Sequence, residues 1–154
     1  MRPMIPFFLS VLSLTCLSSI LISCSTTSSP NGPGPVATEL EGTWVGHTAG
    51  DTSTYTFIFT QNNFTMKSSY LPAASVAYAG TFSINTAANP KQVNSYILQC
   101  SPNPAYVGKT SLGIYKISND TLTYAGNEPG NPQRPVSFLP DTTGVTVVFT
   151  LKRQ

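Results

Sequence analysis

The sequence predicts an all-β domain, most simply an antiparallel up-and-down barrel of about eight strands. Apolar and polar residues alternate with a period of two in successive short segments, and turn residues recur about every eight to twelve positions. No segment after residue 40 shows a helical period. Charged residues make up only 9% of the chain, and Thr, Ser and Asn fill its polar positions, as is typical of strands with one solvated face. A barrel is favoured over an open sheet because closure leaves no strand edge unpaired.

The expected strands follow one another from residue 41. The clearest alternation lies in 76–84, where Val76, Tyr78, Phe82 and Ile84 fall on one face. Turns are expected at 61–63 and 119–120, where Asn and Asp gather. Besides a first strand that opens at 41–44, the expected strands are 54–60, 64–68, 76–84, 93–100, 112–117, 121–124 and 144–152.

Residues 1–23 are predicted to be a secretory signal. A mostly apolar run follows a single positive charge, Arg2, which is the pattern of such signals. A transmembrane anchor is the alternative, but Ser and Thr interrupt the run, and Pro3 and Pro6 break its start. The signal interpretation is therefore preferred.

The end of this segment, Leu21-Ile22-Ser23-Cys24, resembles the bacterial lipobox. The resemblance implies cleavage after Ser23 and lipid attachment to the thiol of Cys24, which anchors the chain to a membrane. Cys16 fits less well, because Ser13 stands where the lipobox has Leu. Ser25, rather than Asp, follows the cysteine, which in Gram-negative lipoproteins implies the outer membrane. The expected location is the cell envelope, on the periplasmic face of the outer membrane or on the cell surface.

Three regions are expected: the signal peptide at 1–23, a lipidated tether at 24–37 and the barrel domain at 38–154. The tether is rich in Ser, Pro and Gly and has no apolar period, so it is predicted to be flexible. Cys100 is the one cysteine left over after Cys16 and Cys24, so no disulfide within the chain is expected.

Composition argues against several functions. The net charge is +2 without a basic run, so nucleic-acid binding is not expected. His47 and Cys100 are too few ligands for a zinc site, so no metal and no cofactor are expected. His47 is interpreted as a surface or rim residue, and Cys100 as a buried, inert thiol at a strand end. Because Asp51, Asp120 and Asp141 fall in predicted turns, no catalytic group is assembled and the domain is not expected to be an enzyme.

The segment Glu41-Gly42-Thr43-Trp44 resembles the opening of lipocalin-type (calycin-type) barrels. Further segments carry a more particular resemblance: Asn89-Pro90-Lys91, 108–115, Asp120-Thr121-Leu122, Gly130, 134–138 and Leu151-Lys152-Arg153. With these segments, about residues 39 to 153 resemble an uncharacterised lipocalin-like domain common in Planctomycetes, a family without an established activity. Tyr124-Ala125 stands where that family often has a cysteine.

The resemblance assigns structural roles at the closed end of the barrel. Gly42 is expected to let the chain pass close under the barrel floor, and Trp44 to plug it. A late basic residue packs over this Trp in lipocalins. Both Arg134 and Arg153 are candidates for that cation–π contact.

The barrel interior is the predicted functional site. We expect a small apolar or amphipathic ligand there. The alternative is a barrel filled by its own side chains, with a protein partner bound at loops 71–75 and 101–105. The candidate ligand-binding residues are Tyr55, Phe57, Phe59, Tyr78, Phe82 and Tyr124. The other residues expected to point inward are Phe64, Met66, Leu112, Ile114 and Phe149.

Overall fold

The computed structural model describes residues 38–70, 76–101, 103–141 and 144–154. The predicted signal peptide at 1–23, the predicted lipidation site Cys24, the predicted tether at 24–37 and the loop 71–75 lie outside the described residues.

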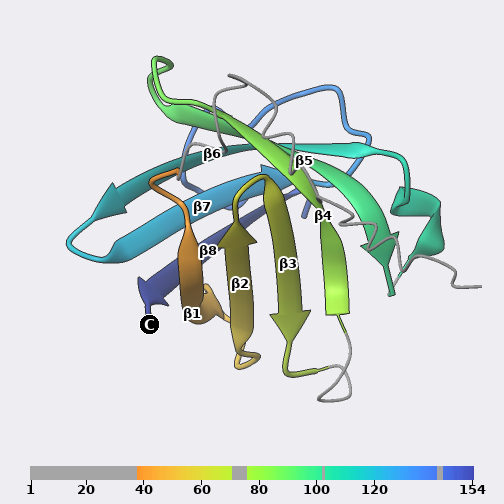
Figure 1. The fold of residues 1–154 in the computed structure, drawn as a ribbon, viewed down its shortest axis with the longest axis horizontal. Helices are drawn as coiled ribbons and strands as arrows, with labels where there is room; N and C mark the ends of the chain where they lie inside the picture. The colour runs from red at the N-terminus through yellow and green to blue at the C-terminus, as the bar shows by residue number, and fades with distance from the viewer. Residues whose placement is uncertain (1–37, 71–75, 102, 142–143) are drawn as a thin grey trace, which may run out of the picture. The chain divides into compact units, whose positions relative to one another are not determined.

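The described residues form eight strands and one short 3-10 helix (Figure 1). Each strand pairs antiparallel with the next, and the last pairs antiparallel with the first, so the barrel is closed. The all-β up-and-down barrel predicted from the sequence is therefore confirmed. The elements are β1 (Gly42–Thr48), β2 (Tyr55–Thr60), β3 (Asn63–Ser68), β4 (Val76–Asn85), β5 (Lys91–Cys100), η1 (Pro104–Tyr106), β6 (Thr110–Ser118), β7 (Thr121–Asn127) and β8 (Thr146–Arg153).

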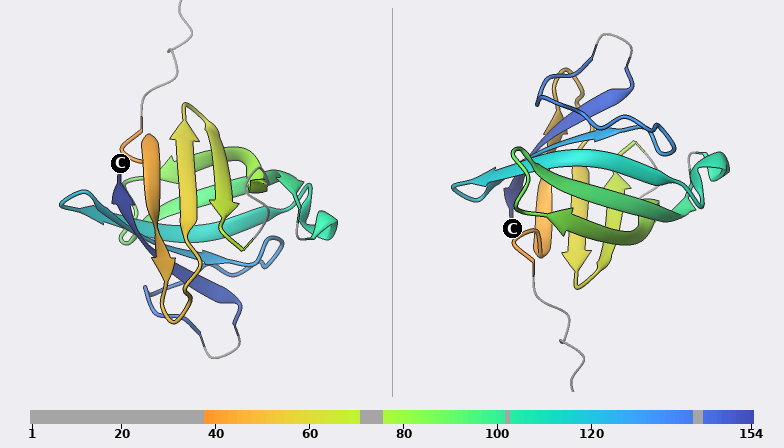
Figure 2. Two further views of the ribbon diagram at one scale, coloured as in Figure 1. Left: turned by 90° about the horizontal axis from the view of Figure 1, so that it is seen from below. Right: turned by 90° about the horizontal axis from the view of Figure 1, so that it is seen from above.

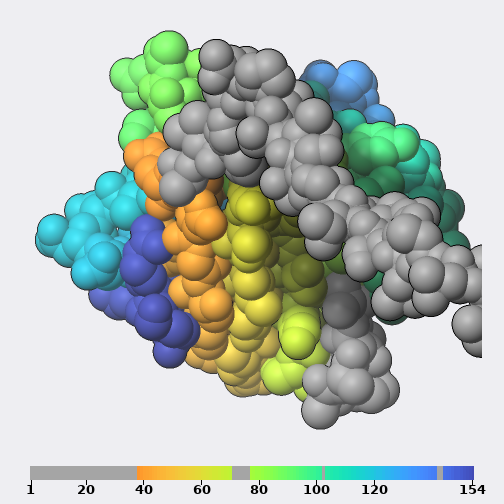
Figure 3. All heavy atoms as spheres, viewed as in Figure 1, coloured from red at the N-terminus to blue at the C-terminus, as the bar shows by residue number. Residues whose placement is uncertain are grey.

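The first half of the barrel crosses the second half steeply. Figure 1 shows β1 to β3 upright at the front, with β6 to β8 running crosswise behind them. Figure 3 shows β1, β2 and β3 side by side, with the end of β8 next to β1. Both views of Figure 2 place the C-terminus beside the start of β1, where the backbone N–H of Gln154 donates to the carbonyl of Thr43 at 3.0 Å.

Close approach of two strands explains Gly46 in β1. A Cβ at this position would lie 2.0 Å from the backbone oxygen of Thr150 in β8, so only glycine fits there. The pairing that closes the barrel, β1 with β8, therefore depends on a residue without a side chain.

Alternate residues of the strands point inward and form one hydrophobic core. The predicted inward positions Phe57, Phe59, Phe64, Met66 and Phe149 all belong to it. Its other members are Leu40, Trp44, Ala77, Phe82, Val93, Ile97, Cys100, Tyr115, Leu122, Tyr124 and Leu151, with Tyr55, Tyr78, Ile84, Tyr106 and Ile117 packed against it.

The prediction that Leu112 and Ile114 point inward was wrong. In β6 the core instead receives Tyr115 and Ile117. Ile114 is only 1% exposed and yet lies outside the core cluster. Two side chains of the segment between β7 and β8 contact the neighbours of Ile114 in β6.

That segment is also longer than the short turns expected from the sequence. It spans residues 128–145 and contains Pro129, Pro132, Pro135 and Pro140, which interrupt strand pairing. Two of its side chains contact β6 close to Ile114. Arg134 donates to the carbonyl of Gly113, and the aromatic ring of Phe138 lies under the ammonium group of Lys116 at 4.9 Å.

Candidate ligand-binding cavity

One end of the barrel is closed by Trp44, which is fully buried. Its indole N–H donates to the carbonyl of Leu40 at 2.7 Å, so the polar atom of the ring is satisfied. The guanidinium carbon of Arg153 lies 4.0 Å from the centre of the ring, which is cation–π geometry. Of the two arginines left open by the sequence, Arg153 is thus the one over Trp44.

Arg134 lies elsewhere, against the outer side of β5 and β6. Its guanidinium donates to the carbonyls of Val93 and Gly113 and to the side chain of Asn94. Arg134 therefore ties the long β7–β8 segment to the barrel wall and does not close the barrel.

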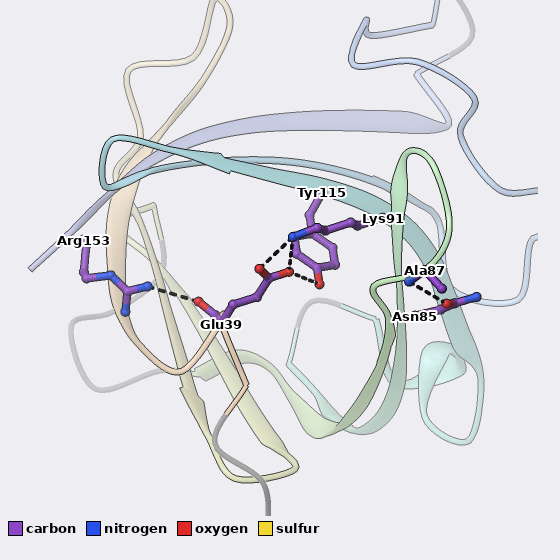
Figure 4. A network of polar contacts seen from close by, with 6 residues as sticks. All are labelled: Glu39, Asn85, Ala87, Lys91, Tyr115 and Arg153. Atoms are coloured by element: carbon purple, nitrogen blue, oxygen red, sulfur yellow. Dashed lines mark hydrogen bonds and ion pairs between the residues drawn. The ribbon is translucent and has the colours of Figure 1, made fainter.

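A polar network borders the closed end (Figure 4). The carboxylate of Glu39 accepts from the Lys91 ammonium at 2.7 Å and from the Tyr115 hydroxyl at 2.7 Å. Burial is the largest single effect on the Glu39 carboxyl and opposes ionisation, but these hydrogen bonds and the charge of Lys91 outweigh it and lower its pKa. Arg153 joins the network through the Glu39 carbonyl at 3.1 Å.

A cavity of about 340 Å³ occupies the other part of the barrel interior. It extends to the end where η1 and the β7–β8 segment lie, because Tyr106, Glu128, Pro129 and Gly144 belong to its lining. This volume falls in the range of small-molecule sites. The remaining lining residues are Phe57, Phe59, Phe64, Met66, Tyr78, Ser95, Ile97, Ser111, Tyr124, Gly126, Asn127, Val145, Val147 and Phe149.

One wall of the cavity is apolar and built from aromatic side chains of β2, β3 and β8. The rings of Phe57 and Phe149 meet edge to face at 5.0 Å, and Phe57 stacks on Phe59 at 6.1 Å. Val147 on β8 also lines the cavity and is 40% exposed, although it faces the barrel interior. Apolar surface is therefore accessible inside the barrel.

The opposite wall, on β5, β6 and β7, carries hydroxyl groups. The hydroxyl of Tyr124 interacts with the hydroxyls of Ser95 and Ser111. Burial raises the pKa of Tyr124, while these hydrogen bonds and the charge of Arg134 act in the opposite direction. Tyr124 is thus a neutral phenol at ordinary pH, able to donate or accept a hydrogen bond.

Two paired glycines make room for this phenol. Gly113 and Gly126 are register partners on β6 and β7. A Cβ on Gly126 would lie 2.7 Å from the Tyr124 ring, and one on Gly113 would lie 3.1 Å from its hydroxyl oxygen. A side chain at Gly126 would displace the ring, and one at Gly113 would press on the hydroxyl group, so the two glycines leave the space that the phenol occupies.

The mouth of the cavity is also polar. The Tyr106 hydroxyl of η1 donates to the carboxylate of Glu128, which follows β7. Burial raises the pKa of Tyr78 most strongly, followed by its electrostatic interaction and hydrogen bond with Cys100, and the negative charge of Glu128 acts in the same direction. The mouth therefore presents a carboxylate together with tyrosine hydroxyls.

Four of the six predicted ligand-binding residues line the cavity: Phe57, Phe59, Tyr78 and Tyr124. The other two, Tyr55 and Phe82, pack in or against the core but lie outside the lining. The Tyr55 hydroxyl donates to Asp51 at 2.6 Å, and burial, with that carboxylate, raises its pKa to about 12.

Sequence reasoning missed the polar lining residues Ser95, Ser111, Tyr106 and Glu128. Ser95 lies on the same face of β5 as the buried residues Val93 and Ile97, because every second residue of a strand shares a face. The sequence pattern therefore could have placed its hydroxyl inside the barrel. Tyr106 and Glu128 lie in connections, where the sequence carries no such period.

Neither His47 nor Cys100 lines the cavity, although Cys100 is the register partner of the lining residue Tyr78. His47 is exposed, with its ring Nδ1 3.0 Å from the Ser53 carbonyl oxygen, and Cys100 is buried at the end of β5, as expected. Within the described ranges, no group of three or more His, Cys, Asp and Glu residues is placed to hold a metal ion. No helix in the described part of the chain has the length and apolar character needed to cross a membrane.

Comparison of the chain with protein-family models, with curated proteins and with solved structures returned no match. A functional assignment therefore depends on the geometry of the cavity.

Proposed function

We propose that the protein is a lipid-anchored binding module of the cell envelope that holds a small amphipathic molecule inside a lipocalin-like barrel, without catalysing a reaction. The observation that carries this proposal is the cavity of about 340 Å³, with aromatic rings on one wall and hydroxyl groups on the other. Sites for small molecules combine an apolar lining with a few polar groups that fix orientation, and this cavity has both.

The membrane part of the proposal depends on the sequence. The lipobox-like segment Leu21-Ile22-Ser23-Cys24 supports lipid attachment at Cys24. The Ser- and Pro-rich residues that follow support a tether between the lipid and the barrel. A binding module held at a membrane surface retains or receives molecules there.

Titration with a neutral, environment-sensitive dye, N-phenyl-1-naphthylamine, tests the binding function. The barrel domain, residues 38–154, is expected to give a saturable rise in dye fluorescence. The matched control is Val147→Trp, which inserts a large ring into the cavity from a position that is 40% exposed. A rise that is equal in both proteins would show that the dye binds elsewhere and would contradict the proposal.

A second candidate is a protein-interaction module. It is favoured by the exposed apolar side chains of Tyr96, Leu98 and Val107, of which Leu98 is 57% exposed. They belong to β5 and to the connection after η1, the region where the Pro-rich loop at 101–105 was predicted to bind a partner. Such patches mark interaction surfaces when they are contiguous. Leu98→Asp separates the two functions. It should weaken binding of a protein partner but leave ligand binding unchanged, because Leu98 is not part of the cavity lining.

A further inference from the structure

We propose that the ligand of this cavity is an amphipathic amine, with its apolar body against the aromatic wall and its positive charge at Glu128. The inference rests on the proposed function and adds the chemical class of the ligand. It follows from the charges around the cavity and from the order of its polar groups.

The lining contains one charged side chain among the described residues, the carboxylate of Glu128. The residues that the structure does not describe around this domain, 71–75, 102 and 142–143, are uncharged in sequence, so they add no cation. A bound carboxylate would therefore lose its hydration without gaining a positive partner, which is costly. Fatty acids and other anions are disfavoured for this reason.

Two nearby cations are already held outside the cavity. The guanidinium of Arg134 donates to backbone carbonyls of Val93 and Gly113. The ammonium of Lys109 lies 5.9 Å from the centre of the Tyr106 ring, and Lys109 is not a lining residue. Neither side chain is placed to receive an anion inside the barrel.

The position of Glu128 suits an ammonium group. Its carboxylate accepts from the Tyr106 hydroxyl, which leaves further lone pairs for a ligand N–H. Tyr78 also lines the cavity, and its aromatic ring can attract a cation, whereas the Tyr106 ring already has the Lys109 ammonium 5.9 Å from its centre. Glu128 is exposed, so water screens its charge and its effect on affinity is moderate.

The hydroxyl wall continues inward from Glu128. The β6–β7 register ends at the Gly113–Gly126 pair, and beyond it the Ser111 hydroxyl donates at 2.6 Å to the carbonyl of Asn127, the residue before Glu128. Ser95 is the register partner of Ser111 on β5. An amine at the mouth thus has neutral hydroxyl groups beside the rest of the molecule, and the described lining holds no second charged side chain.

Isothermal titration calorimetry with three matched probes tests this inference. The full chain is reconstituted in lipid nanodiscs, with empty nanodiscs as the blank. The probes are 2-phenylethylamine, 2-phenylethanol and 3-phenylpropanoate, which share a phenyl ring and differ in the charge at the other end. We expect the amine to bind about fivefold more tightly than the alcohol, and the carboxylate to bind most weakly.

Two variants locate the effect. Glu128→Gln keeps an acceptor for Tyr106 and is expected to reduce amine affinity to that of the alcohol, while alcohol binding stays unchanged. Val147→Trp is expected to abolish binding of all three probes. Amine binding that Glu128→Gln does not weaken, or carboxylate binding as tight as that of the amine, would overturn the inference and leave the proposed function standing. Probe binding that is insensitive to Val147→Trp, or absent from the wild type, would overturn both.

Discussion

The guanidinium carbon of Arg153 lies 4.0 Å from the centre of the Trp44 ring, and the two residues are register partners on β8 and β1. Arg153 also donates to the carbonyls of Glu39 and Glu41, which precede β1. One side chain near the end of the chain thus covers the Trp and fixes the segment that leads into the barrel. This end of the barrel is therefore sealed, and the cavity extends to the other end.

Trp44→Ala is expected to destabilise the domain by about 3–5 kcal/mol. The substitution leaves a large void in a fully buried position and removes the surface on which Arg153 packs. Urea unfolding followed by tyrosine fluorescence measures the change. Val136→Ala is the control, because Val136 is 90% exposed and its loss is expected to change stability by less than about 0.5 kcal/mol. Equal stability of Trp44→Ala and the wild type would show that the ring does not hold this end together.

Gly42→Ala is expected to destabilise the barrel by more than about 1 kcal/mol. Gly42 has a φ of +122°, and a Cβ there would lie 2.9 Å from Nη1 of Arg153. Gly50→Ala is the matched control, since Gly50 also has a positive φ, +79°, but nothing lies within 4 Å of its Cβ position. Thermal unfolding of both variants, with and without Arg153→Ala, separates backbone strain from contact. If Arg153→Ala leaves the difference in stability between Gly42→Ala and Gly50→Ala unchanged, the contact with Arg153 does not contribute to that difference.

Glu39→Gln is expected to reduce the loss of stability in acid. The folded-state pKa of Glu39 lies below its ordinary value of 4.5, so its contribution is fully present above that value. The contribution disappears as pH falls through the lowered folded-state pKa, because the protonated carboxyl no longer attracts Lys91. Urea midpoints measured between about pH 6 and pH 2 should fall less steeply in the variant. Lys91→Met removes one partner but keeps Tyr115, so an intermediate slope is expected; a slope equal to the wild type in both variants would contradict this assignment.

Cys24→Ala is expected to abolish lipid attachment and release the protein from the membrane fraction. The physical reason is that acyl chains supply the membrane affinity, at about 0.8 kcal/mol for each buried CH₂ group. Labelling cells with an alkyne analogue of palmitate, followed by fractionation, measures both effects. Cys16→Ala is the matched control and should retain label. Label that persists in Cys24→Ala would place the lipid on another residue.

Period-two alternation predicted the strands well wherever one face is apolar and the other polar. Residues 54–60 and 93–100, for example, correspond to β2 and β5. Alternation was misleading in β6, where Leu112 and Ile114 on one face and Tyr115 and Ile117 on the other are all apolar. Which of two apolar faces points inward depends on packing against distant parts of the chain, and here Arg134 and Phe138 of the β7–β8 segment contact β6 close to Ile114.

The candidate site was predictable only in part. Aromatic residues such as Phe57 and Tyr124 follow from alternation, because inward positions repeat every second residue. The polar wall depends on packing: Tyr124 reaches Ser95 and Ser111 since Gly113 and Gly126 leave space for its ring. Glu128 and Tyr106 come from separate connections that meet only in the folded barrel. The choice of Arg153 over Arg134 likewise needed the register of β8 on β1.

The most direct test of ligand binding is native mass spectrometry of the barrel domain, residues 38–154, secreted into a bacterial periplasm and purified without detergent. Ligand binding inside the barrel predicts a reproducible added mass in the wild type that denaturation releases, and its absence from Val147→Trp. A clean unliganded mass in both proteins, which persists after incubation with a library of amines and neutral amphiphiles, would contradict it.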